Sequence, residues 1–138
     1  MTKEEAKQIA DLINTRNELT KKYSSESILA SKENYVFIKE ADKIIACAES
    51  KKVQWYQYEI SHVSIDANYE SKGFGSKILK LSENKAIENN ARLLQCTIRT
   101  NNVNSIRLFS TKGYKQVNMF HNLKSGNWVF IYQKIISQ

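Results

Sequence analysis

Apolar residues near the start of the chain recur every three or four positions, which is the period of one face of an α-helix. These residues are Ala6, Ile9, Ala10 and Ile13. Thr2 and Glu5 stand just before them at the spacing of a capping box, which marks a helix start. The pattern predicts a helix over 3–16 and a shorter helix within the more polar stretch 17–31.

Beyond residue 34 the pattern changes to short runs of β-branched and aromatic residues between polar turns, which is typical of strands. Two helical stretches interrupt these runs, one ending near Asn90 and one over 102–112. Gly113 then stands where a left-handed residue ends a helix. The predicted strands cover 35–38, 44–48, 54–65, 93–98, 116–120 and 127–136.

The order of these elements predicts the fold class. A strand, a helix and a strand in mid-chain imply a parallel pair with a right-handed crossover, and hairpins on both sides imply antiparallel neighbours. The result is an α/β (α+β) domain with a mixed central sheet flanked by helices. No repeat or linker divides the chain, so we expect a single domain over residues 1–138.

Composition narrows the ligand without identifying it. The chain has no apolar run long enough for a membrane span and no apolar region at its start, so we expect a cytoplasmic protein. Cys47 and Cys96 are then expected to be small buried residues, and two cysteines with two histidines predict no metal site. A net charge of +7 suits a nucleotide cofactor or a nucleic acid, but a solvated surface also explains it.

Two of the four glycines lie in the segment Gly73-Phe74-Gly75-Ser76, between a predicted strand and a predicted helix. Such a loop presents backbone N–H groups at the positive end of the helix dipole, where a phosphate or pyrophosphate binds. It is not a Walker loop, because no Gly-Lys-Ser/Thr follows, and it lacks the third glycine of a Rossmann fingerprint. A simple tight turn is the alternative interpretation.

Two stretches resemble motifs of the GNAT acetyltransferases. Residues 63–79 resemble the family's central motif, Gln/Arg-x-x-Gly-x-Gly/Ala after a strand, and residues 102–114 resemble its second motif, Asn-x-x-Ala-x-x-Leu-Tyr-x-x-x-Gly-Phe. The motifs stand in the family's order, with a helix and a strand between them. The resemblance covers about residues 34–136.

The resemblance implies a cleft between two splayed parallel strands, with acetyl-CoA as the acyl donor. The pantetheine arm would pair with one strand and touch an asparagine, and the pyrophosphate would rest on loop amides. The cofactor-binding residues that it implies are Val63, Ser64, Ile65, Glu70, Ser71, Lys72, Gly73, Phe74, Gly75, Ser76, Asn102 and Phe109.

Two positions depart from the family pattern. Glu70 stands where Gln or Arg is usual, and Phe109 stands where many members carry a tyrosine that is proposed to protonate the leaving thiolate. Because backbone amides hold most of the pyrophosphate in the family, the change at Glu70 weakens the resemblance without removing it. With Phe109, we expect the thiolate to leave unprotonated or to take its proton from water.

Acyl transfer to an amine needs a base, because an ammonium has no lone pair. The candidates on the third strand are Glu59 and His62, which point to opposite faces unless a bulge intervenes. Glu59 stands eleven residues before Glu70, the spacing of the catalytic Glu in related histone acetyltransferases. His62 has the more suitable intrinsic pKa, about 6.5. A backbone N–H near Ile65 is the expected oxyanion donor.

The favoured function is transfer of an acetyl group from acetyl-CoA to a primary amine by direct attack. The acceptor is a small molecule, a protein lysine or an N-terminus, and a homodimer is one candidate state. One alternative is a GNAT-fold module that binds acyl-CoA without turnover, which Phe109 favours. A second alternative is a phage-type, nucleic-acid-directed acyltransferase, suggested by the net charge and by residues 94–99 and 125–127.

Overall fold

The computed structural model describes residues 1–17, 19 and 21–136. Thr2 and Glu5 form the expected capping box at the first helix. The elements are α1 (Lys3–Arg16), α2 (Ser25–Ala30), η1 (Lys32–Asn34), β1 (Tyr35–Glu40), β2 (Lys43–Gln54), β3 (Gln57–Ile65), η2 (Ala67–Tyr69), α3 (Phe74–Glu88), β4 (Leu93–Arg99), α4 (Val103–Thr111), β5 (Lys115–His121) and β6 (Trp128–Ile135).

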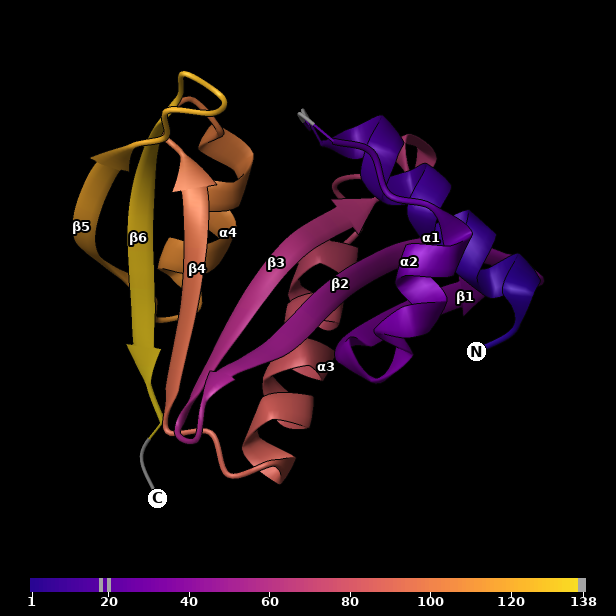
Figure 1. Ribbon diagram of the computed structural model, residues 1–138, viewed down its shortest axis with the longest axis horizontal. Helices are drawn as coiled ribbons and strands as arrows, with labels where there is room; N and C mark the ends of the chain where they lie inside the picture. The colour runs from indigo at the N-terminus through magenta and orange to yellow at the C-terminus, as the bar shows by residue number, and fades with distance from the viewer. Residues whose placement is uncertain (18, 20, 137–138) are drawn as a thin grey trace.

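The strands form one six-stranded sheet in the order β1-β2-β3-β4-β6-β5. Strands β3 and β4 are parallel, joined through α3, and the other neighbouring pairs are antiparallel. Helices α1 and α2 cover one face of the β1–β3 half, and α3 and α4 lie on the opposite face of the sheet (Figure 1). The mixed sheet flanked by helices that the sequence predicts is confirmed.

The two central strands separate along their length. β3 pairs with β4 only where Gln57–Glu59 lie beside Leu93–Gln95. Beyond Glu59 the two halves of the sheet diverge, as Figure 1 shows. The edge of β3 that faces β4 therefore has no strand partner from residue 60 onward, and its backbone polar groups are open to a ligand.

A bulge in β3 lies just past the point of separation. Ser61 pairs with Glu49 and Ser64 with Cys47, so two residues of β3 stand opposite one residue of β2. His62 takes up the extra length in the left-handed region, with φ of 54°. A bulge of this kind bends and twists its strand, which helps to carry β3 away from β4.

The boundaries of the second hairpin differ from the sequence prediction. The predicted strands over 44–48 and 54–65 are in fact β2, which runs on to Gln54, and β3, which begins after a turn at Trp55 and Tyr56. The polar stretch 49–52 breaks the apolar pattern, so the pattern indicated a loop there. Lys51 and Lys52 face solvent from this hairpin, while Ser50 is buried and its hydroxyl donates to the carbonyl of Ser82.

Two main apolar cores hold the sheet. Ile9 and Ile13 of α1 pack with Cys47 under the N-terminal helices. Leu79 of α3 and Cys96 of β4 belong to the second core, on the opposite side. Both cysteines are buried free thiols, as expected, and burial raises the pKa of Cys47 to about 12. Within the described chain, no helix is both long and apolar enough to cross a membrane.

Candidate active site

A cleft of about 310 Å³ opens where β3 and β4 separate. Its walls come from these two strands, from the first turns of α4, and from the β5–β6 connection, with the end of α1 at its rim. The cleft is lined by Asn17, Leu19, Ile60, Ser61, His62, Val63, Cys96, Thr97, Ile98, Arg99, Asn102, Ser105, Phe109, Phe120, Asn122, Ser125, Asn127 and Val129.

The glycine loop ends at the uncapped N-terminus of α3. Gly73 is the N-cap residue, with φ of 85° and no side-chain cap. The first helical bond runs from Lys77 N–H to the Gly73 carbonyl, so the amides of Phe74, Gly75 and Ser76 have no acceptor within the helix. These N–H groups lie at the positive end of a helix dipole, which is the arrangement that binds phosphate.

The predicted residues of β3 divide into two groups. Val63 lines the cleft. Ser64 is buried, and its hydroxyl donates to the His62 carbonyl and accepts from the side-chain amide of Asn17. Ile65 packs with the cluster around Ile78 of α3. The side chains of Ser64 and Ile65 are therefore structural, and the backbone of this segment is what remains for a cofactor.

Glu70 does not point to the loop amides as a free carboxylate. It forms an ion pair with Arg16 in the last turn of α1, so a cation reaches this position from another element. Lys72 lies over the ring of Tyr69 at 5.6 Å. Lys77 lies over the ring of Phe74 at 4.9 Å. Several cations therefore surround the loop, and no sequence motif predicted the one on α1.

The second motif supplies one polar and one apolar wall of the cleft. Asn102 caps α4, because its Oδ1 accepts from the Ser105 N–H at 3.3 Å, which leaves the side-chain NH₂ to donate to a ligand. Phe109 is buried and its ring meets that of Tyr114 edge-on, with centroids 5.0 Å apart. Phe109 is therefore a packing residue that lines the cleft and supplies no proton.

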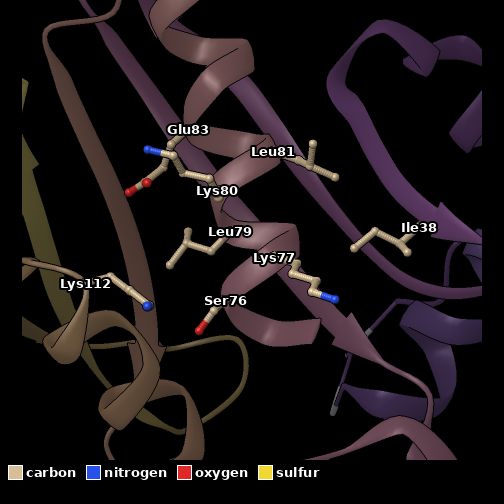
Figure 2. Close-up of a pocket in the computed structure, with 8 residues that line it drawn as sticks. All are labelled: Ile38, Ser76, Lys77, Leu79, Lys80, Leu81, Glu83 and Lys112. Carbon is tan, nitrogen blue, oxygen red and sulfur yellow. The ribbon is translucent and has the colours of Figure 1, made fainter. Parts of the chain in front are cut away.

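A second hollow, of about 570 Å³, follows the outer surface of α3. Lys112 ends α4, and Figure 2 shows its ammonium and the Ser76 hydroxyl converging from either side. The Glu83 carboxylate forms an ion pair with the Lys134 ammonium at 3.1 Å and accepts a hydrogen bond from the Tyr114 hydroxyl at 2.8 Å. The lining residues are Ile38, Ser76, Lys77, Leu79, Lys80, Leu81, Glu83 and Lys112. The hollow begins at the N-terminal end of α3, and no motif predicted Lys112 there.

The two candidate bases occupy different places. The bulge intervenes, so His62 turns to the α1–α2 face, and its Nε2 lies 2.6 Å from the hydroxyl oxygen of Tyr23. Glu59 belongs to the same face, since it alternates with the buried Tyr58 and Ile60. His62 lines the cleft, whereas Glu59 is not among the lining residues and lies on the last paired rung of β3 and β4, next to the point where the cleft opens.

Burial sets the charge of His62. It lowers the pKa of the imidazole below its ordinary value of 6.5, and the carboxylate of Glu49 opposes this only in part. His62 is therefore neutral at pH 7 and carries a lone pair. Glu49 also accepts a hydrogen bond from the Ser61 hydroxyl at 3.3 Å. A neutral imidazole at the cleft wall, with the Glu49 carboxylate within electrostatic reach, is suited to take a proton from an ammonium.

Strands β3 and β4 are parallel and separate next to a helix N-terminus that suits an anion. This arrangement defines an α/β domain suited to an extended, phosphate-bearing cofactor in the middle of the sheet. Residues 4–114 match the model of the acetyltransferase (GNAT) family. The chain therefore belongs to the GNAT acetyltransferases, as the two motifs predicted. Compared with curated proteins by sequence, the chain has no match.

Solved structures share the fold at low sequence identity. The Ard1 protein of Thermoplasma volcanium aligns with a TM-score of 0.86 and 18% identity, over 100% of this chain and 95% of its own. A putative acetyltransferase from Salmonella typhimurium, solved with its cofactor acetyl-CoA, gives 0.85 and 16%, over 100% and 92%. The ribosomal-protein-S18-alanine N-acetyltransferase of Escherichia coli gives 0.80 and 16%, over 100% and 92%.

Proposed function

We propose that this chain transfers the acetyl group of acetyl-CoA to a primary amine by direct attack. One observation carries the proposal: the open edge of β3 beyond Glu59 leads to the uncapped N-terminus of α3. An extended cofactor with a pyrophosphate in its middle needs both features, in that order. The Salmonella typhimurium structure holds acetyl-CoA on the same fold, which supports this assignment.

In this proposal, each part of acetyl-CoA binds a different surface of the protein. The pantetheine arm pairs with the backbone of residues 63–65, and the NH₂ of Asn102 donates to it. The pyrophosphate rests on the amides of residues 71–76. The nucleotide end then enters the hollow along α3, where Lys80 and Lys112 supply positive charge to its phosphate.

His62 is the proposed base. Its neutral ring takes one proton from the acceptor ammonium, and the resulting amine attacks the thioester carbonyl. A backbone N–H near Ile65 stabilises the oxyanion. The C–S bond then breaks, and the departing thiolate takes the second proton of the attacking nitrogen, so Phe109 need not donate one. Glu59, next to the point where the cleft opens, contributes negative charge that attracts the ammonium.

The basicity of His62 favours an N-terminal α-amine over a lysine. An α-ammonium has a pKa of about 8, and a lysine ammonium about 10.4, so the lysine proton is harder to remove by roughly 3 kcal/mol. An imidazole whose pKa lies below 6.5 is therefore better matched to the α-amine. The fold of an alanine N-acetyltransferase of a ribosomal protein is consistent with this preference.

Thiol release with acetyl-CoA tests the function on three acceptors: a peptide with a free α-amine and no lysine, the same peptide blocked at its N-terminus with one lysine, and DNA. We expect turnover on the first peptide to exceed that on the second by about tenfold or more. Binding of acetyl-CoA without turnover on any acceptor would support a non-catalytic module, and turnover on DNA alone would support the nucleic-acid alternative.

Two variants then identify the base. We expect His62→Asn to lower kcat by about 100-fold, the usual scale for a general base, and Glu59→Gln to act mainly on KM for the amine. Because the base must be neutral, the wild-type rate should fall as pH drops through the His62 pKa, below 6.5. A larger loss of kcat in Glu59→Gln than in His62→Asn would transfer the role to Glu59.

A further inference from the structure

Tyr23 contacts His62, although no motif marks it. Its hydroxyl oxygen lies 2.6 Å from Nε2, and the two rings meet edge-on with centroids 4.9 Å apart. Tyr23 lies between α1 and α2, far from β3 in sequence and partly buried. The contact therefore depends on how the N-terminal helices are placed over the sheet.

The backbone of Tyr23 is fixed at two points. The side-chain Nδ2 of Asn14 donates to the Tyr23 carbonyl at 2.8 Å, and Asn14 Oδ1 accepts from the Tyr23 N–H at 2.8 Å. Asn14 lies in α1, so this helix fixes both backbone hydrogen-bonding groups of Tyr23. The phenol therefore reaches His62 from a backbone position that α1 determines.

The backbone of His62 is fixed as well. Ser64 Oγ donates to the His62 carbonyl at 2.9 Å and accepts from Asn17 Nδ2 at 2.8 Å, and the same Nδ2 bonds the Ile13 carbonyl. A non-glycine residue at φ of 54° costs roughly 1–2 kcal/mol and persists where its surroundings determine it. Hydrogen bonds from α1 thus reach His62 by two routes, one to its ring and one to its backbone.

The contact decides which ring nitrogen is free. Nε2 is covered by Tyr23, whereas Nδ1 bonds to none of the described residues. No solvent-shielded polar side-chain atom among them lacks a partner, so Nδ1 is open to solvent, and His62 lines the cleft. We propose that Tyr23 is the positioning residue of the catalytic base: its oxygen accepts the Nε2–H of His62, which fixes the tautomer with the lone pair on Nδ1, towards the acceptor. This inference rests on the proposed function, in which His62 is the base.

The charges around the pair agree with these roles. Burial and the Glu49 carboxylate raise the pKa of Tyr23, so it stays a neutral phenol. Tyr35 of β1 also lies within electrostatic reach of Tyr23, and Arg99 lines the same cleft as His62. When Nδ1 takes a proton, the Nε2–H bond to Tyr23 becomes charge-assisted and stronger, and Glu49 stabilises the imidazolium.

Long-range ¹H–¹⁵N NMR of the imidazoles reads the tautomer directly. The chain has two histidines, and His121 serves as an internal control because its Nε2 must donate to the Gly126 carbonyl, 3.2 Å away. In the neutral wild-type protein we expect His62 to carry its proton on Nε2. In Tyr23→Phe, which keeps the ring contact and removes the oxygen, we expect a mixture of tautomers at His62 and no change at His121.

Kinetics of the same variant give the functional readout. Tyr23→Phe should lower kcat by about tenfold, leave KM for acetyl-CoA unchanged, and move the acid limb of the pH profile to lower pH, because the imidazolium loses a hydrogen-bond acceptor. Tyr56→Phe, in the β2–β3 turn, is the matched control and should do none of this. Asn14→Asp, which loses the donor to the Tyr23 carbonyl, should act in the same direction as Tyr23→Phe.

A proton on Nδ1 in neutral wild-type protein would overturn the inference, as would a Tyr23→Phe protein with unchanged tautomer and pH profile. If Tyr23→Phe does not fold, the wild-type tautomer and Asn14→Asp decide. If the wild-type protein shows no turnover, the proposed function fails, while the tautomer experiment still tests the role of Tyr23 separately.

Discussion

Gly73 shows how a single residue combines a backbone requirement with a ligand requirement. It has φ of 85°, and a Cβ added to it would meet no described heavy atom within 4 Å. Gly126 has φ of 75° and equally open surroundings, but it lies in the β5–β6 connection, between the cleft-lining Ser125 and Asn127, and not in the glycine loop. The two positions therefore share a backbone cost, and only Gly73 adjoins the free amides of α3.

This difference gives a matched test. Alanine at either glycine should lower the free energy of unfolding by about 1 kcal/mol, the cost of the left-handed region. Only Gly73→Ala should also weaken acetyl-CoA binding, by about tenfold, because its Cβ stands beside the loop amides. Denaturant unfolding and titration calorimetry on both variants measure this, and equal effects on binding would show that the loop does not hold the pyrophosphate.

Residue-scale prediction from sequence works where backbone geometry demands one residue type. Gly73 and Asn102 could be predicted because a positive φ and a helix cap restrict the choice of residue. Tyr23 and Lys112 could not, since each reaches the site only through packing between segments distant in sequence. Glu70 is predicted to bind the cofactor, and its ion pair with Arg16 is a contact that no motif indicated.

At the scale of elements, the Arg16–Glu70 ion pair joins the end of α1 to the start of the glycine loop. Glu70→Gln removes a negative charge beside the anion and frees Arg16 to approach it, so acetyl-CoA should bind about 2–5-fold more tightly. Arg16→Gln should weaken binding by a similar factor, and the double variant should lie near wild type. Calorimetry at low salt measures all three, and tighter binding in Arg16→Gln would refute this role.

The elements themselves were predictable where apolar periodicity is strong. The period of α1 and the order of strands around α3 define the sheet. The polar half of β2 was not predictable, because a hairpin that faces solvent has no apolar pattern. The bulge at His62 was not predictable either, because it depends on pairing with β2. That bulge places Glu59 and His62 on one face, which simple alternation would have separated.

At the scale of the whole molecule, the sheet consists of two antiparallel halves joined by one short parallel contact. Each half has its own strand hydrogen bonds, so the splay between them leaves the pairing of either half intact. The core around Leu79 joins the halves, because it includes Ile60 of β3 and Cys96 of β4. The cleft opens at this junction, with His62 on one half and Asn102 on the other. The net charge of +7 favours a polyanionic ligand, and acetyl-CoA binding should weaken as salt is raised.

The binding of acetyl-CoA in the cleft is tested by titration calorimetry against the wild-type protein. We expect saturable binding of one acetyl-CoA per chain, and loss of most of the affinity when acetyl-pantetheine, which lacks the pyrophosphate and nucleotide, replaces it. The absence of saturable binding, or equal affinity for the two ligands, would contradict the cleft and the α3 N-terminus as the cofactor site.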